Sequence, residues 1–311
     1  MIVLSLFDGI SCGQLALQRA GIKVNTYYAS EINPNSIKIT QNNFPNTIQL
    51  GDIRELTELK LRKLPKIDLL IGGSPCENLS ITACNRPSVA SGLKGEKSSL
   101  FFDYVRILHI VKPTYFLLEN VASMKVENKN IISNILGVEP VLINSNLVSA
   151  QDRERLYWTN IAGITQPKDK QILLKDIMQQ EVLEKYYYNK PFTFNGIDKK
   201  VIATLQVNTT DMCKRVYNPN FKMATLTAVR GGYQEKKVYD NGRVRKLTPI
   251  EYERLQNLPD NYTYGFSNNI RYSCIGDGWT VDVIGNILQN IKTEYENNNK
   301  YDNSYNIEHI V

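Results

Sequence analysis

The sequence predicts an α/β protein with a mixed, mostly parallel sheet, an antiparallel edge to that sheet and a second, smaller and irregular domain. Three observations predict this architecture. Short β-type runs alternate with helix-length segments through the first half of the chain, two more β-type runs follow in close succession, and regular patterning is lost after Gly163. Alternation of the first kind is typical of parallel strands joined by covering helices.

The parallel part of the sheet is built from the first half of the chain. Its strands are expected at residues 2–6, 24–29, 47–50, 67–71 and 114–118. Helices are expected in the segments between them, for instance over residues 14–20 and 100–110. The next two β-type runs, residues 141–147 and 155–161, are close enough in sequence to pair antiparallel. We expect that pair at one edge of the sheet.

The second domain is predicted over residues 186–265, which leaves residues 1–185 and 266–311 for the large domain. Up to residue 240 the segment is rich in Tyr, Asn, Thr and Lys, and it contains Gly-Gly and Asp-Asn-Gly turn signals. Irregular patterning of this kind predicts short elements and loops rather than long helices or strands.

Helical patterning returns after this segment. Thr248 is a suitable N-cap, Pro249 suits the first turn, and Glu251 completes a capping box. A last helix is expected over residues 279–291 and is predicted to return to the large domain.

Positive charge is concentrated in the second domain. The chain carries 37 Lys and Arg against 31 Asp and Glu, a net charge of +6. Residues 186–265 hold thirteen Lys and Arg against seven Asp and Glu, so this segment accounts for the whole surplus. The distribution favours a polyanion-binding module attached to a neutral catalytic body. The alternative is a solvated basic face without a special function.

Composition argues against several classes of protein. Hydrophobic residues make up 42% and charged residues 22%, as in ordinary globular proteins. The five cysteines are scattered and include no C-x-x-C pair, which argues against a disulfide framework or a zinc site and fits a reducing cytoplasm. Two histidines leave little material for histidine acid/base catalysis. The apolar N-terminus, interrupted at Asp8, reads as a buried strand rather than a signal peptide, and no run is long enough to cross a membrane.

A thiol stands at the end of a predicted buried strand. Residues 67–71 are followed by two glycines and then by Ser74-Pro75-Cys76. The proline stiffens the turn that delivers Cys76 to the sheet edge at which α/β proteins place their chemistry. Cys76 is therefore predicted to be a nucleophile, and Glu119, at the end of the fifth strand, is predicted to be its acid partner. The alternative for Glu119 is a buried carboxylate paired with a basic residue.

Acidic side chains follow the second and third strands, and a glycine-containing loop follows the first. The loop of residues 7–13 opens the first helix, Glu31 ends the second strand region and Asp52 ends the third. A carboxylate at the second strand tip can accept hydrogen bonds from both ribose hydroxyls, and Asp52 could accept one from an adenine amine. Together these positions favour a nucleoside cofactor. Singly, each carboxylate could instead be a helix cap or a surface group.

Two arginines stand at the start of the edge strand. Strand alternation would place Gln151, Arg153 and Arg155 on one face. Two guanidinium groups there could hold a phosphate or a carbonyl and would stabilise a nearby thiolate. The alternative is an exposed, salt-bridged strand end.

These motifs, in this order, resemble the DNA (cytosine-5)-methyltransferase family, and several are similar to its animal de novo type. The resemblance includes further blocks in the second half of the chain. These are Tyr157-Trp158, Arg245-Lys246-Leu247-Thr248, Arg254-Leu255-Gln256 and Gly276-Asp277-Gly278-Trp279. It implies a Rossmann-like S-adenosylmethionine-dependent methyltransferase domain with a small irregular target-recognition domain.

The resemblance implies methyl transfer from S-adenosylmethionine to carbon 5 of a cytosine in double-stranded DNA. The Cys76 thiolate would add to carbon 6 while Glu119 holds and protonates ring nitrogen 3, and the resulting enamine would attack the methylsulfonium. Gln151, Arg153 and Arg155 would organise the cytosine and its surroundings. The base must leave the stacked duplex to reach such a site, and the loop of residues 77–99 would close over it.

The resemblance also implies the contacts to the cofactor. Phe7 would lie against the adenine, Glu31 would bind the ribose, and Asp52 would read the adenine edge. The full implied set is Phe7, Asp8, Gly9, Ile10, Ser11, Gly13, Glu31, Ile32, Asp52, Ile53, Ser74, Asp277, Gly278 and Trp279. Two residues depart from the family pattern, since Glu77 stands where Gln is usual and Asp277 where Asn is common.

The expected partner is double-stranded DNA, with no membrane and no metal, and a restriction endonuclease of the same system is left open. Two alternatives keep the fold, namely methylation of transfer RNA and a catalytically silent DNA-binding homologue. The basic insert favours DNA over transfer RNA. Methylation of an amino group is disfavoured because that chemistry favours an Asp/Ser/Asn-Pro-Pro-aromatic tetrad, whereas the chain has Ser74-Pro75-Cys76.

Overall fold

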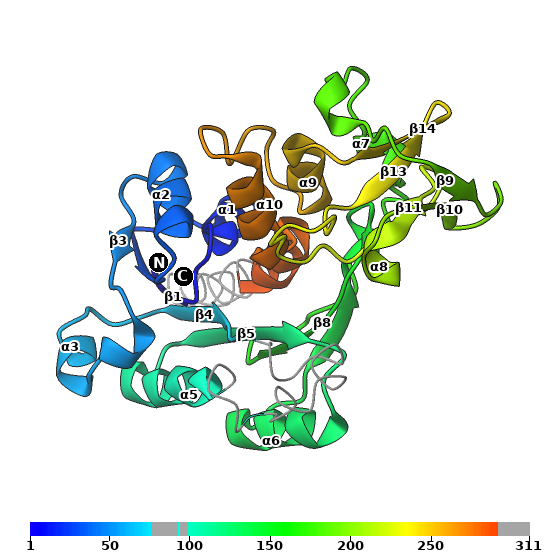
Figure 1. The fold of residues 1–311 in the computed structure, drawn as a ribbon. Coiled ribbons are helices and arrows are strands. Elements are labelled where there is room, and N and C mark those ends of the chain that lie inside the picture. Colours follow the sequence, from blue (N-terminus) through cyan, green and yellow to red (C-terminus); the bar gives the residue numbers. More distant parts are fainter. Residues whose placement is uncertain (76–92, 94–98, 292–311) are drawn as a thin grey trace, which may run out of the picture.

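A seven-stranded sheet is the central layer of the molecule (Figure 1), in a computed structural model that describes residues 1–75, 93 and 99–291. The strands lie in the order β3-β2-β1-β4-β5-β8-β6. Their bounds are β1 Ile2–Leu6, β2 Thr26–Ser30, β3 Ile48–Gln49, β4 Leu69–Gly73, β5 Tyr115–Val121, β6 Val141–Asn144 and β8 Glu154–Thr159. Strands β1 to β5 pair in parallel, and β8 pairs antiparallel with both β5 and β6. The predicted mixed sheet with an antiparallel edge is confirmed.

The strand order reverses between β1 and β4. The chain runs outward from β1 through β2 to β3, then returns to place β4 on the other side of β1, with β5 beyond it. In open α/β sheets, ligands bind where the connections from two neighbouring strands diverge in this way. The carboxyl ends of β1 and β4 are therefore the place to look for a site.

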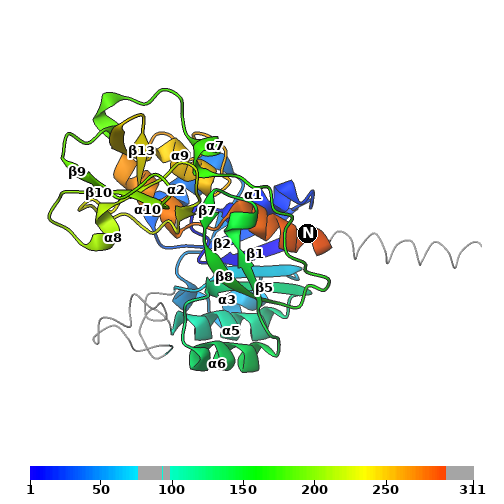
Figure 2. The ribbon, with the colours of Figure 1, turned by 90° about the vertical axis from the view of Figure 1, so that its right-hand side faces the viewer.

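Helices cover both faces of the sheet (Figures 1 and 2). One face carries α5 and α6, and the other carries α1, α2 and α10. Their bounds, with that of the short α3, are α1 Cys12–Arg19, α2 Pro34–Asn43, α3 Glu58–Arg62, α5 Leu100–Val111, α6 Val126–Leu136 and α10 Asn268–Asp277. Alternation along β1 serves both layers, since Val3 packs into one apolar cluster and Leu4 and Leu6 into the other. Among the described residues, no helix has the length and apolar character needed to span a membrane.

A second sheet of five strands lies beside the first (Figure 2), in the order β14-β13-β11-β10-β9. Its strands are β9 Phe192–Phe194, β10 Val201–Leu205, β11 Arg215–Tyr217, β13 Lys237–Asp240 and β14 Arg243–Lys246, with the short helices α7 Leu174–Ile177 and α8 Asp211–Lys214 nearby. This segment is more regular than its sequence suggests. The strands are only three to five residues long, and the β10–β11 register shifts between Val201 and Ala203. In strands this short, apolar and polar residues alternate too few times for the sequence to reveal the strand.

The predicted capping box at Thr248 is confirmed, and it is joined to a buried ion pair. Thr248 caps α9 (Pro249–Leu255), and the Glu251 carboxylate accepts a hydrogen bond from the Thr248 amide. The same carboxylate accepts two hydrogen bonds from Arg245, each 2.8 Å long, and both side chains are 0% exposed. Asp240 also accepts from Arg245 at 2.6 Å. A buried guanidinium satisfied in this way ties β14 to α9.

Part of the basic surplus is buried rather than displayed. Lys236 is 8% exposed, and no ion pair in the described part of the chain includes it. Burial lowers the pKa of its ammonium from 10.5 to about 8. Lys237, next to it, donates to the carbonyl oxygens of Tyr233 and Glu235. The charge count therefore overstates how basic the surface of this segment is.

Replacement of Lys236 by methionine should stabilise the protein at neutral pH. The folded chain holds this proton less tightly than the unfolded chain, so below pH 8 the buried charge destabilises the fold, and the effect disappears as pH rises toward 10.5. We expect Lys236→Met to raise the free energy of unfolding by up to about 3 kcal/mol at pH 7. Urea unfolding at pH 7 and pH 10 measures the difference between variant and parent. A difference that does not shrink at the higher pH would contradict the account.

Candidate active site

Glu119 lies at the end of β5, where it pairs in register with Gly73 of β4. Both of its carboxylate oxygens have donors. Arg155 Nε lies 2.7 Å from Oε1, and Trp279 Nε1 donates to Oε2 at 3.1 Å. The side chain is buried, so these two contacts fix the plane of the carboxylate in a region of low dielectric. The ion pair with Arg155 matches the alternative reading of Glu119, a buried carboxylate paired with a basic residue.

The turn after β4 is held by Asn120, the residue that follows Glu119. Its Nδ2 donates to the carbonyl oxygen and the hydroxyl of Ser74, at 3.2 and 3.1 Å. Asn120 therefore fixes the backbone immediately before Pro75. The predicted nucleophile Cys76, and the loop of residues 77–98 apart from Leu93, lie outside the described residues. The structure thus places the Glu119 carboxylate and the turn that leads to Cys76 on adjacent strand ends.

Arg153 and Gln151 connect the two parts of the chain. Arg153 is buried and donates to the carbonyl oxygens of Leu226, at 2.8 Å, and Gly278, at 3.1 Å. Gln151 is buried as well, and its side-chain oxygen accepts from the Leu226 amide at 2.7 Å while its amide donates to Leu255 and Gln256. The described contacts of these two residues are thus structural, and the contact with Glu119 belongs to Arg155.

The loop after β1 has an unusual backbone that a carboxylate holds in place. Phe7, Gly9 and Ser11 all adopt positive φ values, of 57°, 59° and 58°. Glu31 accepts from the Gly9 amide at 2.8 Å through Oε2, and its Oε1 accepts from the amides of Ile32 and Asn33. Since a carboxylate oxygen can accept about two hydrogen bonds, Oε2 keeps one acceptor position. Glu31 therefore joins the loop to α2 and can still bind one hydroxyl.

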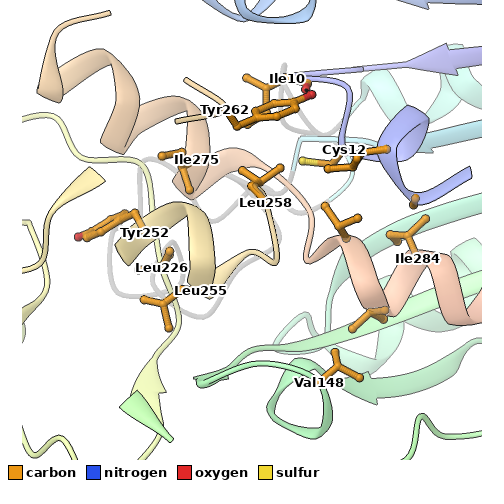
Figure 3. Packing of buried hydrophobic residues seen from close by; sticks show 14 of the residues in the cluster. Ile10, Cys12, Val148, Leu226, Tyr252, Leu255, Leu258, Tyr262, Ile275 and Ile284 are labelled. Atoms are coloured by element: carbon orange, nitrogen blue, oxygen red, sulfur yellow. Dashed lines mark hydrogen bonds between the residues drawn. The ribbon is translucent and has the colours of Figure 1, made fainter. Parts of the chain in front are cut away.

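Asp8 points toward the interior of the same loop. It accepts hydrogen bonds from the hydroxyls of Tyr27, at 2.8 Å, and Ser11. Burial raises the pKa of Asp8 to about 6. Tyr262, which no sequence pattern singled out, supports the loop from the other side because its hydroxyl donates to Ile10 O at 2.7 Å (Figure 3). The described contacts of Asp8 and Ile10 thus shape the loop.

Asp52 caps the 3-10 turn Ile53–Glu55 and is gripped by Arg54. The Arg54 side chain makes contacts of 3.0 and 2.6 Å with Oδ2, and its hydrogen bonds lower the pKa of Asp52. Asp52 is therefore kept as an anionic acceptor. Ile53, next to it, is buried, whereas Ile32 is 66% exposed. Of these two predicted cofactor residues, only Ile32 therefore presents most of its side chain at the surface.

Two glycines beside Glu31 and Asp52 border open space. Gly9 and Gly51 have φ values of +59° and +77°, and a Cβ atom at either would meet no atom within 4 Å. Open space therefore lies beside both glycines, and the carboxylates next to them supply the hydrogen-bond acceptors that ribose hydroxyls and an adenine amine require. Gly13 differs, since a Cβ there would lie 2.5 Å from Ile71, so it is a packing residue.

The segment after α10 packs against the first helix and against Arg153. Gly278 packs against Cys12, whose sulfur lies 3.1 Å from where a Cβ of Gly278 would be, and its carbonyl oxygen accepts from Arg153 and from Gln256. Asp277, at the last position of α10, is exposed. No group of three or more His, Cys, Asp or Glu residues in the described part of the chain could hold a metal ion.

Comparison with known proteins gives matches along nearly the whole chain. A family model described as C-5 cytosine-specific DNA methylase matches residues 1–293. The orphan methyltransferase M.SPRI of Bacillus phage SPR is 27% identical over 292 residues, which cover 74% of this chain and 64%, less than two thirds, of that protein. The type II methyltransferase M.HpaII of Haemophilus parainfluenzae is 26% identical over 330 residues, covering 90% of this chain and 86% of the relative.

A solved structure shares the fold. The Entamoeba histolytica methyltransferase EhMeth superimposes with a TM-score of 0.71 at 17% sequence identity, over 95% of this chain and 98% of its own. The mixed sheet and its covering helices are thus the fold of a known methyltransferase structure.

Proposed function

Because the chain belongs to the C-5 cytosine-specific DNA methylase family, we propose that it transfers a methyl group to carbon 5 of a flipped-out cytosine in double-stranded DNA through a covalent cysteine adduct. The observation that carries the proposal is the arrangement of Glu119. This carboxylate is held by Arg155 and Trp279 directly beside the turn that leads into Cys76. An acid and a thiol on neighbouring strand ends can act on one ring at the same time.

Each residue has a role that follows from the chemistry of cytosine. Carbon 5 is a poor nucleophile, so the ring has to be activated first. The Cys76 thiolate adds to carbon 6, and Glu119 binds ring nitrogen 3 and supplies the proton that neutralises the charge developing there. Loss of the proton from carbon 5 then expels Cys76 by elimination. Arg155 keeps Glu119 oriented and adds positive charge near the thiolate.

We propose S-adenosylmethionine as the methyl donor, and when bound it supplies a methyl group on an electrophilic sulfonium. Glu31 would accept from a ribose hydroxyl through the free position on Oε2, and Asp52 would accept from the adenine amine in place of one of its hydrogen bonds from Arg54. Phe7, partly buried at the end of β1 with a positive φ, would lie against the base. Trp279 and Gly278 would border the methionine end.

DNA is preferred over transfer RNA as the substrate on two grounds. M.HpaII, which matches 90% of this chain, is a type II methyltransferase by name. The surplus of six positive charges lies in residues 186–265, which we take as the target-recognition part. Polyanion binding by this part would be salt-dependent.

Covalent trapping tests the proposal. Duplex DNA containing 5-fluorocytosine should form a stable adduct with the protein in the presence of S-adenosylmethionine, because fluorine blocks the final elimination. Cys76→Ala should abolish the adduct, and Cys213→Ala, a free thiol in the small sheet region, is the matched control that should not. An adduct that persists in Cys76→Ala would refute the assignment of the nucleophile.

Substrate choice is measured separately. Tritiated methyl groups should be incorporated into duplex DNA and not into transfer RNA, and incorporation confined to RNA would overturn the choice of polymer. Bisulfite sequencing of DNA from cells that express the protein would then report the base and its sequence context in one measurement.

A further inference from the structure

We propose that Trp279 is a positioning residue that orients the catalytic carboxylate, so that the segment after α10 acts directly on cytosine activation. The inference deepens the proposed function and rests on it. Its basis is the hydrogen bond of 3.1 Å from the indole nitrogen to Glu119 Oε2, which joins side chains 160 residues apart in the sequence. The resemblance to the family implies a contact of Trp279 with the cofactor.

The strand beneath this contact is shaped to accommodate it. A Cβ atom on Gly73 would lie 2.8 Å from Trp279 Nε1 and 2.9 Å from Glu119 Oε2. Any side chain at this position would push the donor and the acceptor apart. The end of β4 therefore leaves room for the indole and the carboxylate to meet directly over its last residue.

Two donors from opposite sides restrict rotation of the carboxylate. Arg155 binds Oε1 and Trp279 binds Oε2, so loss of either would leave the group free to turn about its terminal bond. Each oxygen retains an acceptor position, so the cytosine edge can still be bound. Proton transfer to ring nitrogen 3 depends on this orientation, because hydrogen bonds weaken steeply when they bend.

Hydrogen bonds also hold the residues on either side of Trp279. The Gly278 carbonyl oxygen before it accepts from Arg153 and from Gln256, at 3.1 and 3.0 Å. The Thr280 hydroxyl after it donates to Gln256 at 2.8 Å. Since Arg153 also binds the Leu226 carbonyl oxygen, the position of Trp279 depends on the segment that joins the two sheets.

Adduct formation without methyl transfer gives the direct readout. Addition of Cys76 to carbon 6 makes carbon 5 exchange its hydrogen with water, so tritium is released from DNA that carries 5-tritiated cytosine when no methyl donor is present. Trp279→Phe removes only the N–H donor and keeps an aromatic ring. We expect the rate of tritium release to fall about 10- to 100-fold, as for loss of a buried hydrogen bond to a charged group. The dissociation constant for S-adenosylmethionine should stay within about threefold.

The chain contains a matched control. Its other tryptophan, Trp158, is buried on β8 and donates to the Ser133 hydroxyl at 3.0 Å, within the apolar cluster of α5 and α6. Trp158→Phe makes the same chemical change away from Glu119 and should leave tritium release within about twofold of the parent after correction for folded fraction. Gly73→Ala is a second test variant, since it separates donor and acceptor without altering either, and it should reproduce the loss.

The outcomes are distinguishable. If the parent protein releases no tritium and forms no adduct, the proposed function fails. If the parent is active and both Trp279→Phe and Gly73→Ala match it, the positioning role alone is overturned. Weaker cofactor binding with unchanged tritium release would assign Trp279 to the cofactor and would also overturn it.

Discussion

Replacement of Glu119 by glutamine is expected to lower the methylation rate by a factor of about 10² to 10⁴, the range that general acid catalysis contributes. Glutamine has nearly the same volume, so packing against β4 is kept. Its amide cannot supply an acidic proton. It also presents N–H groups to Arg155 or Trp279, both of which are donors, so one of the two present contacts becomes repulsive.

Single-turnover methylation of duplex DNA measures this effect, with DNA affinity determined in parallel by electrophoretic mobility shift. Affinity should stay nearly constant, because Glu119 is buried and contributes no positive charge to the duplex. Glu127→Gln on α6 is the control, since it makes the same chemical change at an exposed position. A Glu119→Gln enzyme with the parental rate would remove this carboxylate from the mechanism.

Replacement of Gly276 by alanine is expected to cause the largest loss of stability. In α10, a Cβ atom at this position would lie 2.3 Å from the Thr227 carbonyl oxygen and 2.7 Å from the Ala228 amide nitrogen. Both are backbone atoms of the segment that Gln151 and Arg153 hold, so neither can move aside as a flexible side chain would. Overpacking of this kind costs about 3 kcal/mol, and we expect the melting temperature to fall by about 5 to 10 °C.

The helix of residues 281–291 offers the control for that variant. A Cβ on Gly285 would meet only the Ala16 carbonyl oxygen, at 3.7 Å, which is ordinary contact. Gly285→Ala should therefore be neutral or stabilise by up to about 1 kcal/mol, because alanine favours a helix. Thermal unfolding of both variants gives the comparison. Equal changes in melting temperature for the two variants would mean that the close backbone contact at Gly276 is not the cause of the lost stability.

The sheet could be predicted from the sequence because its strands are apolar and lie between clear helical segments. The bounds of β1 match the prediction, and those of the other strands differ from it by up to three residues, as at β4, which spans Leu69–Gly73 rather than residues 67–71. There the Asp68 carboxylate accepts from the Ile2 amide before the strand begins. Hydrogen bonds between residues this far apart in the sequence leave no periodic signal.

The candidate site was only partly accessible from the sequence. The strand-end position of Glu119 follows from patterning, because parallel strands deliver their ends to one edge. Its ion pair with Arg155 does not, because it depends on how the antiparallel strand β8 pairs with β5. The contact of Trp279 with Glu119 could not be predicted, since it depends on how the chain returns after α10. The charge count likewise could not reveal that Arg245 and Lys236 are buried.

The contacts between the two parts of the chain, which we call the seam, include several made by backbone atoms of residues 223–226. Strand β12 (Met223–Ala224) pairs with β7 (Gln151–Asp152), and the Met223 amide, the Leu226 amide and the Leu226 carbonyl oxygen all bond to the large part of the chain. In the small part, all three of these atoms belong to the main chain. They are therefore present whichever side chains the small part carries. Chimeras that import residues 186–222 from a relative should thus keep these main-chain contacts, although they would replace Lys200 and Lys222, whose side chains also contact the large part.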